Sequence, residues 1–204
     1  PIERAIRQVG LGQKARIIEK PSDANSSANV IDIYELDEIQ DTDFPVGVLS
    51  EKSARASHAW GEAATQLALA GSVDAITTAP VNKEAWRLAG FSDKGHQEVF
   101  QRLTGADYVA TMLVSGSLRC MHLSTHLSLA EACHYVTKEN VLRAINLTSE
   151  YFIRWGVVKP RIGVAALNPH ASDGGLIGQT EEKEILPAIL AAQADGIDAI
   201  GPVP

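Results

Sequence analysis

Two histidines, His126 and His170, follow segments that the sequence predicts to be β-strands, residues 118–123 and 161–167. In parallel α/β sheets, ligands bind beyond the carboxyl ends of the strands, so side chains from two such ends can converge. Neutral imidazole is the commonest side-chain ligand of transition metals. We therefore expect His126 and His170 to bind one divalent metal. The alternative is that each is a loop histidine that hydrogen-bonds to nearby backbone.

A third metal ligand has to come from a carboxylate, His96, a partner chain or further sequence, because even a catalytic zinc usually has three protein ligands. His96 itself lies in the segment Gly95–Glu98, at the start of a predicted helix. There its imidazole and the amides of the first turn can donate hydrogen bonds to an anionic substrate. The alternative is an ordinary solvated helix start.

A glycine-rich loop, residues 168–179, follows the strand at 161–167 and precedes a helix that opens with Glu181. Glycines allow backbone amides to converge on an anion, and a helix N-terminus favours negative charge. The loop is either a substrate or phosphate cradle or an ordinary loop. It lacks the Gly-Lys-Ser/Thr ending of a phosphate-binding P-loop, and no G-x-G-x-x-G follows any predicted strand.

The remaining histidines and the cysteines are interpreted as structural. His122 lies in an apolar strand and is expected in the core, whereas His58 and His134 are expected on helix surfaces. Cys120 and Cys133 lack the basic neighbours that lower a thiol pKa, so we expect small buried hydrophobic residues.

Helical and strand-like segments alternate along the chain, which predicts an α/β fold with a mostly parallel sheet covered by helices. The expected helices span residues 2–9, 51–70, 83–88, 96–103, 138–155 and 181–193. The expected strands span residues 15–18, 30–34, 73–77, 108–114, 118–123, 161–167 and 197–200. We expect the apolar face of the 51–70 helix to include Ala56, Trp60 and Leu67. Thr180 is expected to cap the last helix and Pro187 to kink it.

The composition and charge of the chain argue against several classes of protein. The chain has 204 residues, 45% hydrophobic and 21% charged, as in ordinary globular proteins. Its net charge of −7 disfavours a nucleic-acid partner, and neither a membrane-spanning segment nor a signal peptide is visible. With two cysteines and no CxxC pair, a cytoplasmic location is expected. The chain begins without methionine and stops after a strand, so we expect sequence to be missing at both ends.

Four segments, in order, resemble motifs of the 4-hydroxythreonine-4-phosphate dehydrogenase family of vitamin B6 biosynthesis. They are T-A-P-V-N-K at 78–83, G-H-Q-E at 95–98, S-T-H-L-S-L at 124–129 and L-N-P-H-A-S-D-G-G-L-I-G at 167–178. The final G-P-V-P is similar to the start of a fifth family motif. The similarity runs from about residue 46 to the last residue, and the first 45 residues fit loosely.

The resemblance implies a three-layer αβα fold like that of isocitrate and isopropylmalate dehydrogenases, and a homodimer with active sites at the subunit interface. It also implies a divalent metal (Zn, Mg, Mn or Co) bound by three histidines, two of which correspond to His126 and His170. His96 and Gln97 correspond to substrate-binding positions. The third histidine and the nucleotide-binding portion are expected beyond residues 1–204, which we interpret as one incomplete part of a dehydrogenase, inactive on its own.

The implied reaction is oxidation of a phosphorylated hydroxy acid by NAD or NADP, followed by decarboxylation. Three departures from the family pattern, at Gln97, Ser128 and Ser172-Asp173, favour an altered substrate, such as threonate or erythronate 4-phosphate. The alternatives are a dihydrodiol carboxylate dehydrogenase of the same family, a non-catalytic phosphometabolite-binding domain, or a metal-dependent hydrolase.

Overall fold

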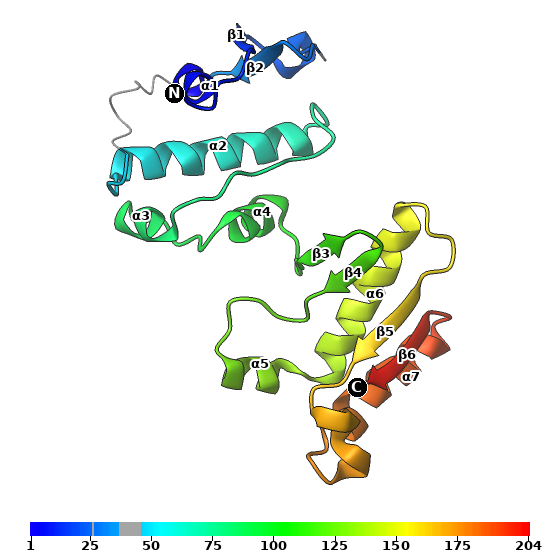
Figure 1. Ribbon diagram of the computed structural model, residues 1–204. Coiled ribbons are helices and arrows are strands. Elements are labelled where there is room, and N and C mark those ends of the chain that lie inside the picture. The colour runs from blue at the N-terminus through cyan, green and yellow to red at the C-terminus, as the bar shows by residue number, and fades with distance from the viewer. Residues whose placement is uncertain (26, 37–45) are drawn as a thin grey trace. The chain divides into compact units, whose positions relative to one another are not determined.

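The computed structural model describes residues 1–25, 27–36 and 46–204. The chain forms two compact units, Pro1–Val109 and Ala110–Pro204 (Figure 1). Each unit combines helices with a pair of parallel strands, which confirms the predicted α/β class. The antiparallel hairpin expected after residue 108 is also present, and its strands are shorter than predicted.

The first unit begins with helix α1 and a parallel strand pair and continues with three helices. Its elements are α1 (Ile2–Gln8), β1 (Lys14–Ile18), η1 (Pro21–Asp23), β2 (Val30–Tyr34), α2 (Glu51–Leu69), α3 (Lys83–Leu88) and α4 (His96–Thr104). Side chains cap two of the helices: Ser50 accepts the backbone N–H of Ser53, and Asn82 accepts that of Ala85. These caps explain why α2 and α3 begin where they do.

The predicted apolar face of helix α2 is confirmed in part, because Ala56 is buried and Leu67 is half-buried, but the prediction for Trp60 is wrong. Trp60 is 42% exposed, whereas Ala54, His58 and Thr65 are buried. The buried face packs against α3 and α4, where Trp86 is fully enclosed and its indole N–H donates to the Ser57 hydroxyl at 2.8 Å. Helix α2 therefore uses small and polar residues for its contacts, because the bulky group at this interface comes from α3.

A network of charged and aromatic groups surrounds His58, which is only 4% exposed, so its predicted surface position is wrong. Its ring stacks on Phe91 with centroids 3.7 Å apart, and its Nε2 lies 2.8 Å from Asp93 Oδ2. Arg102 donates to the same Asp93 oxygen at 2.7 Å and to Glu62 at 2.8 Å. The network therefore ties the loop before α4 to helices α2 and α4.

The predicted strand at residues 73–77 is wrong, because the structure has an irregular segment there that is largely exposed. A strand needs a neighbouring strand to satisfy its backbone N–H and C=O groups. In the described part of this unit, β1 and β2 pair with each other, and no strand pairs with residues 73–77. The apolar run by itself does not supply that partner.

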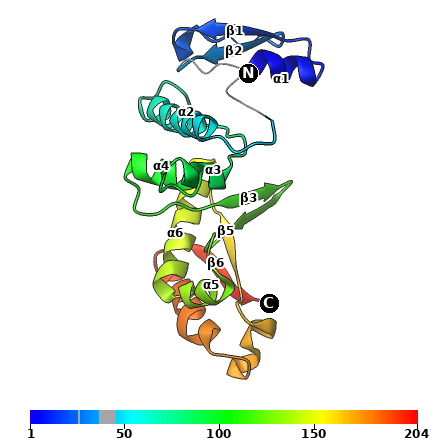
Figure 2. The same ribbon diagram turned by 90° about the vertical axis from the view of Figure 1, so that its left-hand side faces the viewer.

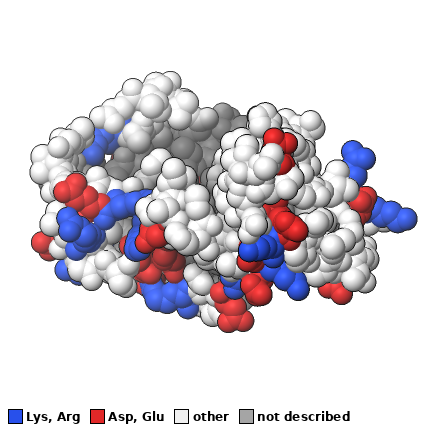
Figure 3. Space-filling model, turned by 90° about the horizontal axis from the view of Figure 1, so that it is seen from below, with Lys and Arg blue, Asp and Glu red and all other residues white. Residues whose placement is uncertain are grey.

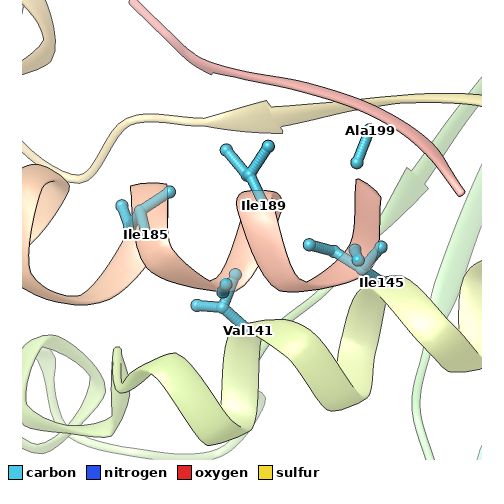
Figure 4. Close-up of a cluster of buried hydrophobic side chains, with 7 residues drawn as sticks. Val141, Ile145, Ile185, Ile189 and Ala199 are labelled. Carbon is cyan, nitrogen blue, oxygen red and sulfur yellow. The ribbon is translucent and has the colours of Figure 1, made fainter. Parts of the chain in front are cut away.

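In the second unit, helices α6 and α7 pack against each other, and the β5–β6 pair packs mainly against α7 (Figures 1 and 2). Its elements are β3 (Met112–Ser115), β4 (Leu118–Met121), α5 (Leu129–Tyr135), α6 (Lys138–Arg154), β5 (Arg161–Ala165), η3 (Pro169–Gly175), η4 (Glu181–Ile185), α7 (Leu186–Ala194) and β6 (Asp198–Val203). Strands β3 and β4 form the antiparallel hairpin, and β5 pairs in parallel with β6. In Figure 4, Ile189 of α7 lies between α6, which carries Val141 and Ile145, and the β5–β6 pair.

The last predicted helix changes its hydrogen-bonding pattern just before Pro187, while the backbone angles at Ile185 and Leu186 remain helical. Residues Glu181–Ile185 form a wide π-helical turn, η4, and α7 starts just after it. Proline has no N–H to donate to the carbonyl one turn earlier, which disrupts regular α-helical bonding at this point. Thr180 makes no side-chain capping hydrogen bond, so its predicted capping role is wrong.

Charge is mixed on the surface of the chain. Acidic and basic side chains are interspersed on the face shown in Figure 3. Among the residues that the structure describes, no helix is long and apolar enough to cross a membrane.

Asp93 is expected to stabilise the first unit in a pH-dependent way. The Arg102 guanidinium lowers the pKa of Asp93, burial opposes this effect, and the contact with His58 lowers the pKa further. We expect Asp93→Asn to reduce the free energy of unfolding by about 1–3 kcal/mol at neutral pH. Because the folded-state pKa is lowered, this contribution is present above the ordinary value of 3.8 and is lost as the pH falls below it.

Urea unfolding between pH 3 and 7 measures this effect. Glu51→Gln is the control, since Glu51 makes only an exposed contact with Arg55 at 3.9 Å and its loss is expected to cost at most about 0.5 kcal/mol. Equal destabilisation by the two substitutions, or a difference that is as large at pH 3 as at pH 7, would contradict the prediction.

Candidate active site

The loop that follows β5 is held at its start by the carboxylate of Glu181. Its Oε1 accepts the backbone N–H groups of Leu167 at 2.9 Å and Asn168 at 2.6 Å. Its Oε2 accepts the side-chain amide of Asn168 at 2.9 Å. Glu181 is only 3% exposed, so this buried carboxylate has three donors where it would otherwise carry a large desolvation cost.

The hydrogen bonds also determine the charge of Glu181. Burial on its own raises the pKa of this carboxyl group, but hydrogen bonds from Asn168, Leu167 and the backbone of Glu181 itself more than offset it. The pKa is therefore lowered, and Glu181 is ionised at neutral pH. The sequence analysis considered Glu181 only as the start of a helix, because nothing in its spacing indicates a contact with residues 13 and 14 positions earlier.

His170 begins a left-handed turn in this loop. Residues 170–174 have φ angles between 47° and 67°, although only Gly174 among them is a glycine. Left-handed helical conformation costs about 1–2 kcal/mol for each non-glycine residue. Such strain persists only where surrounding contacts enforce it, and it is concentrated at functional sites. The predicted glycine-rich loop is confirmed, but its left-handed path through non-glycine residues was not predicted.

His126 also has left-handed backbone, with φ of 57°, and lies between β4 and α5. Both His126 and His170 are exposed in this chain, and both belong to the second unit. Their imidazoles are suitable ligands for a divalent transition metal. The described residues contain no cluster of three or more histidine, cysteine, aspartate or glutamate side chains that could hold a metal ion. Each imidazole is thus a suitable donor for a metal, but the described residues do not complete a ligand set around either histidine.

Ser128, one of the departures from the family pattern, is the N-cap of α5. Its hydroxyl accepts the backbone N–H of Glu131 at 3.3 Å, and the Glu131 carboxylate in turn accepts the backbone N–H of Ser128 at 2.9 Å. This reciprocal capping box places the N-cap of α5 two residues after His126.

In the first unit, His96 is the first residue of α4 and is half-buried among aromatic rings. The His96 and Trp86 rings pack edge to face with centroids 5.8 Å apart, and the His96 and Phe100 rings stack with centroids 6.1 Å apart. Burial lowers the pKa of the His96 imidazole, so the ring is neutral at pH 7 and retains one N–H donor. Gln97 follows it and is also half-buried.

Two of the motif segments come together beside His96. A Cβ atom at Gly95 would lie 3.7 Å from Lys83 Cε and 3.5 Å from Glu98 Oε2. These are ordinary contact distances, so the Lys83 side chain lies beside Gly95 and the 78–83 and 95–98 segments are neighbours.

The predictions for the histidines and cysteines that were interpreted as structural are confirmed for some residues and wrong for others. His134 is exposed as predicted, and His122 is half-buried beside the hairpin. Cys120 and Cys133 are exposed, so their predicted burial is wrong. Cys120 lines a mainly apolar cavity of about 550 Å³ between the β3–β4 hairpin, α6 and β5. Neither His126 nor His170 lines this cavity.

Comparison with known proteins identifies the family of these motifs. The family described as "Pyridoxal phosphate biosynthetic protein PdxA" matches residues 2–204. The chain belongs to the PdxA family. The resemblance seen in the four motifs is therefore confirmed, and it extends over the first 45 residues as well.

Several members of the PdxA family are similar over the whole chain. A D-threonate 4-phosphate dehydrogenase from Cupriavidus necator is 39% identical over 204 residues, which are 100% of this chain and 61% of the relative. A 4-hydroxythreonine-4-phosphate dehydrogenase from Beijerinckia indica is 38% identical over 203 residues, 100% of this chain and 60% of the relative. The crystal structure of a 4-hydroxythreonine-4-phosphate dehydrogenase from Klebsiella pneumoniae superimposes with a TM-score of 0.91 at 32% identity, covering 100% of this chain and 62% of that one. The chain thus spans about three fifths of the length of these relatives.

Gly178 is expected to be essential for the shape of the loop. It has φ of 118°, and a Cβ there would lie 3.0 Å from Nδ2 of Asn168, which Glu181 holds in place. We expect Gly178→Ala to destabilise the protein by about 1–3 kcal/mol in thermal or urea unfolding. Gly163→Ala in β5 is the matched control, because a Cβ there meets open space and should be neutral or stabilise by up to about 1 kcal/mol. A similar loss in both variants would contradict this account of the loop.

Proposed function

We propose that this chain is part of a dehydrogenase that oxidises a phosphorylated hydroxy acid, with decarboxylation, using a divalent metal and NAD or NADP. The observation that carries the proposal is the PdxA family match over residues 2–204, which includes all four motif segments. Relatives that are 38–39% identical are named as dehydrogenases of D-threonate 4-phosphate and 4-hydroxythreonine 4-phosphate.

Within this proposal, His126 and His170 supply two imidazole ligands to the metal. When bound, a metal (zinc, magnesium, manganese or cobalt) would supply stabilisation of negative charge on the substrate oxygen, and NAD or NADP would supply the hydride acceptor. The remaining metal ligand and the nucleotide-binding residues lie outside these 204 residues, consistent with the greater length of the relatives. We further propose a cytoplasmic homodimer in which the two subunits share each active site.

The first unit supplies substrate-binding groups. His96 is neutral and has an N–H to donate to an oxygen of the anionic substrate. Gln97 has an amide that both donates and accepts, with a longer reach than a threonine hydroxyl. The half-buried position of both residues limits competition from water for these hydrogen bonds.

Replacement of either proposed metal ligand tests the metal site. We expect His126→Ala and His170→Ala in the full-length protein to lower metal affinity and kcat together, each by more than about 100-fold, since loss of a mere supporting residue already costs about 10–100-fold. His134→Ala is the control, because His134 is an exposed histidine whose ring lies 2.7 Å from the Ala130 carbonyl.

Metal content by elemental analysis and steady-state turnover are the two measurements. If both alanine variants keep stoichiometric metal and near-normal turnover, the assignment of His126 and His170 is wrong.

Gln97 is expected to contribute to substrate choice. We expect kcat/KM to be higher for threonate or erythronate 4-phosphate than for 4-hydroxythreonine 4-phosphate, and Gln97→Thr to reduce that preference about tenfold. A site built to hydrogen-bond one substrate group discriminates against an analogue that leaves its polar partner unpaired. Gln101→Thr, in the same helix, controls for the general effect of replacing a glutamine with threonine in α4. A preference for 4-hydroxythreonine 4-phosphate that Gln97→Thr leaves unchanged would refute both the substrate and the role of Gln97.

A further inference from the structure

We propose that Glu181 is a positioning residue for the metal site, because it holds the backbone that leads to His170. The inference rests on the proposed role of His170 as a metal ligand. Glu181 lies in the π-helical turn η4, and its contacts reach across to the end of β5. It therefore joins the helix layer of the second unit to the loop that carries the histidine.

The contacts at the start of the loop leave His170 little freedom. Glu181 fixes Asn168 through both its backbone N–H and its side-chain amide. Pro169 follows, and its ring fixes φ. Few backbone torsions therefore separate the anchored Asn168 from the His170 imidazole.

The far side of the loop is held as well. The backbone N–H of Ile177 donates to the carbonyl of Ser172 at 3.1 Å, and Ser172 itself is buried. Gly178, near the end of the loop, lies against the side chain of Asn168 at the beginning of the loop, so the two ends of the loop are in contact and the loop is closed. Because the turn from His170 to Asp173 is left-handed in non-glycine residues, it would relax to another conformation once this closure is lost.

Two explanations for a Glu181 effect give opposite results with conservative substitutions. If Glu181 acts by geometry, Glu181→Gln is the milder change, since the glutamine oxygen still reaches both backbone N–H groups and the Asn168 amide can rotate to accept from the new NH₂. Glu181→Asp is then the severe change, because the shorter side chain does not reach all three donors at once. If Glu181 acts only through its negative charge, the order is reversed.

The experiment measures Zn²⁺ affinity of the full-length protein by competition with a chromophoric chelator, and the visible absorption of bound Co²⁺. We expect Glu181→Asp to weaken Zn²⁺ binding about 10–100-fold and to change the Co²⁺ spectrum, and Glu181→Gln to weaken binding much less. Glu182→Gln removes the same charge from an exposed neighbour and should have no effect. Hydrogen exchange, followed by mass spectrometry, should accelerate in residues 167–178 of the Glu181→Asp variant and remain unchanged in β3 and β4.

The outcomes separate this inference from the proposed function. If Glu181→Asp accelerates exchange but leaves Zn²⁺ affinity unchanged while His170→Ala abolishes it, Glu181 does not position the ligand, and the metal site stands. Weaker binding in Glu181→Gln than in Glu181→Asp would also overturn the inference. If His170→Ala leaves Zn²⁺ affinity unchanged, the metal site itself fails and the inference with it. Should Glu181→Asp not fold, Asn168→Ala is the second variant, and unchanged affinity and exchange in it would refute the anchoring role.

Discussion

A carboxylate buried in a protein interior is stable only if donors replace the water that it has lost. In the second unit, Glu181 meets this requirement with two backbone N–H groups and the amide of Asn168. The same three bonds bring the end of β5, the strained turn and the helical region of η4 and α7 into one arrangement. Each part depends on the others: the loop satisfies the carboxylate, and the carboxylate stabilises a loop whose left-handed residues are unfavourable by themselves.

The first unit also stabilises a buried carboxylate, but with charged side chains as partners in place of backbone N–H groups. Asp93 is the buried carboxylate there, and His58 and Arg102 are its partners. It lies in the loop immediately before α4, the helix that His96 begins. In both units, therefore, a carboxylate with several partners lies next to a segment whose residues match the family motifs. The buried carboxylates thus hold loops in place, whereas the aliphatic cluster of α6, α7 and β6 holds the helices and strands of the second unit together.

The sequence correctly predicted those helices and turns whose ends are marked by local residues, such as a capping side chain or a turn-forming glycine. Helix α6 begins after the capping residue Thr137, and the hairpin turns at Ser115–Leu118, both as expected. The strand predicted at residues 73–77 is wrong because strand formation depends on a partner elsewhere in the chain. The surface position predicted for His58 is wrong because Asp93 and Phe91, distant in the sequence, enclose its ring. At the candidate site, strand ends and motifs singled out His126 and His170 as candidate ligands. The Glu181 anchor and the left-handed turn depend on contacts between residues that no local pattern connects.

The capping box at Ser128 has a consequence for the segment that carries His126. The Ser128 hydroxyl accepts a backbone N–H, and the Glu131 carboxylate in return accepts the backbone N–H of Ser128. His126 lies two positions before this cap and has left-handed backbone. The cap therefore gives the chain after His126 a fixed point of attachment, and a substitution at Ser128 or Glu131 would act on the direction in which the backbone leaves that histidine.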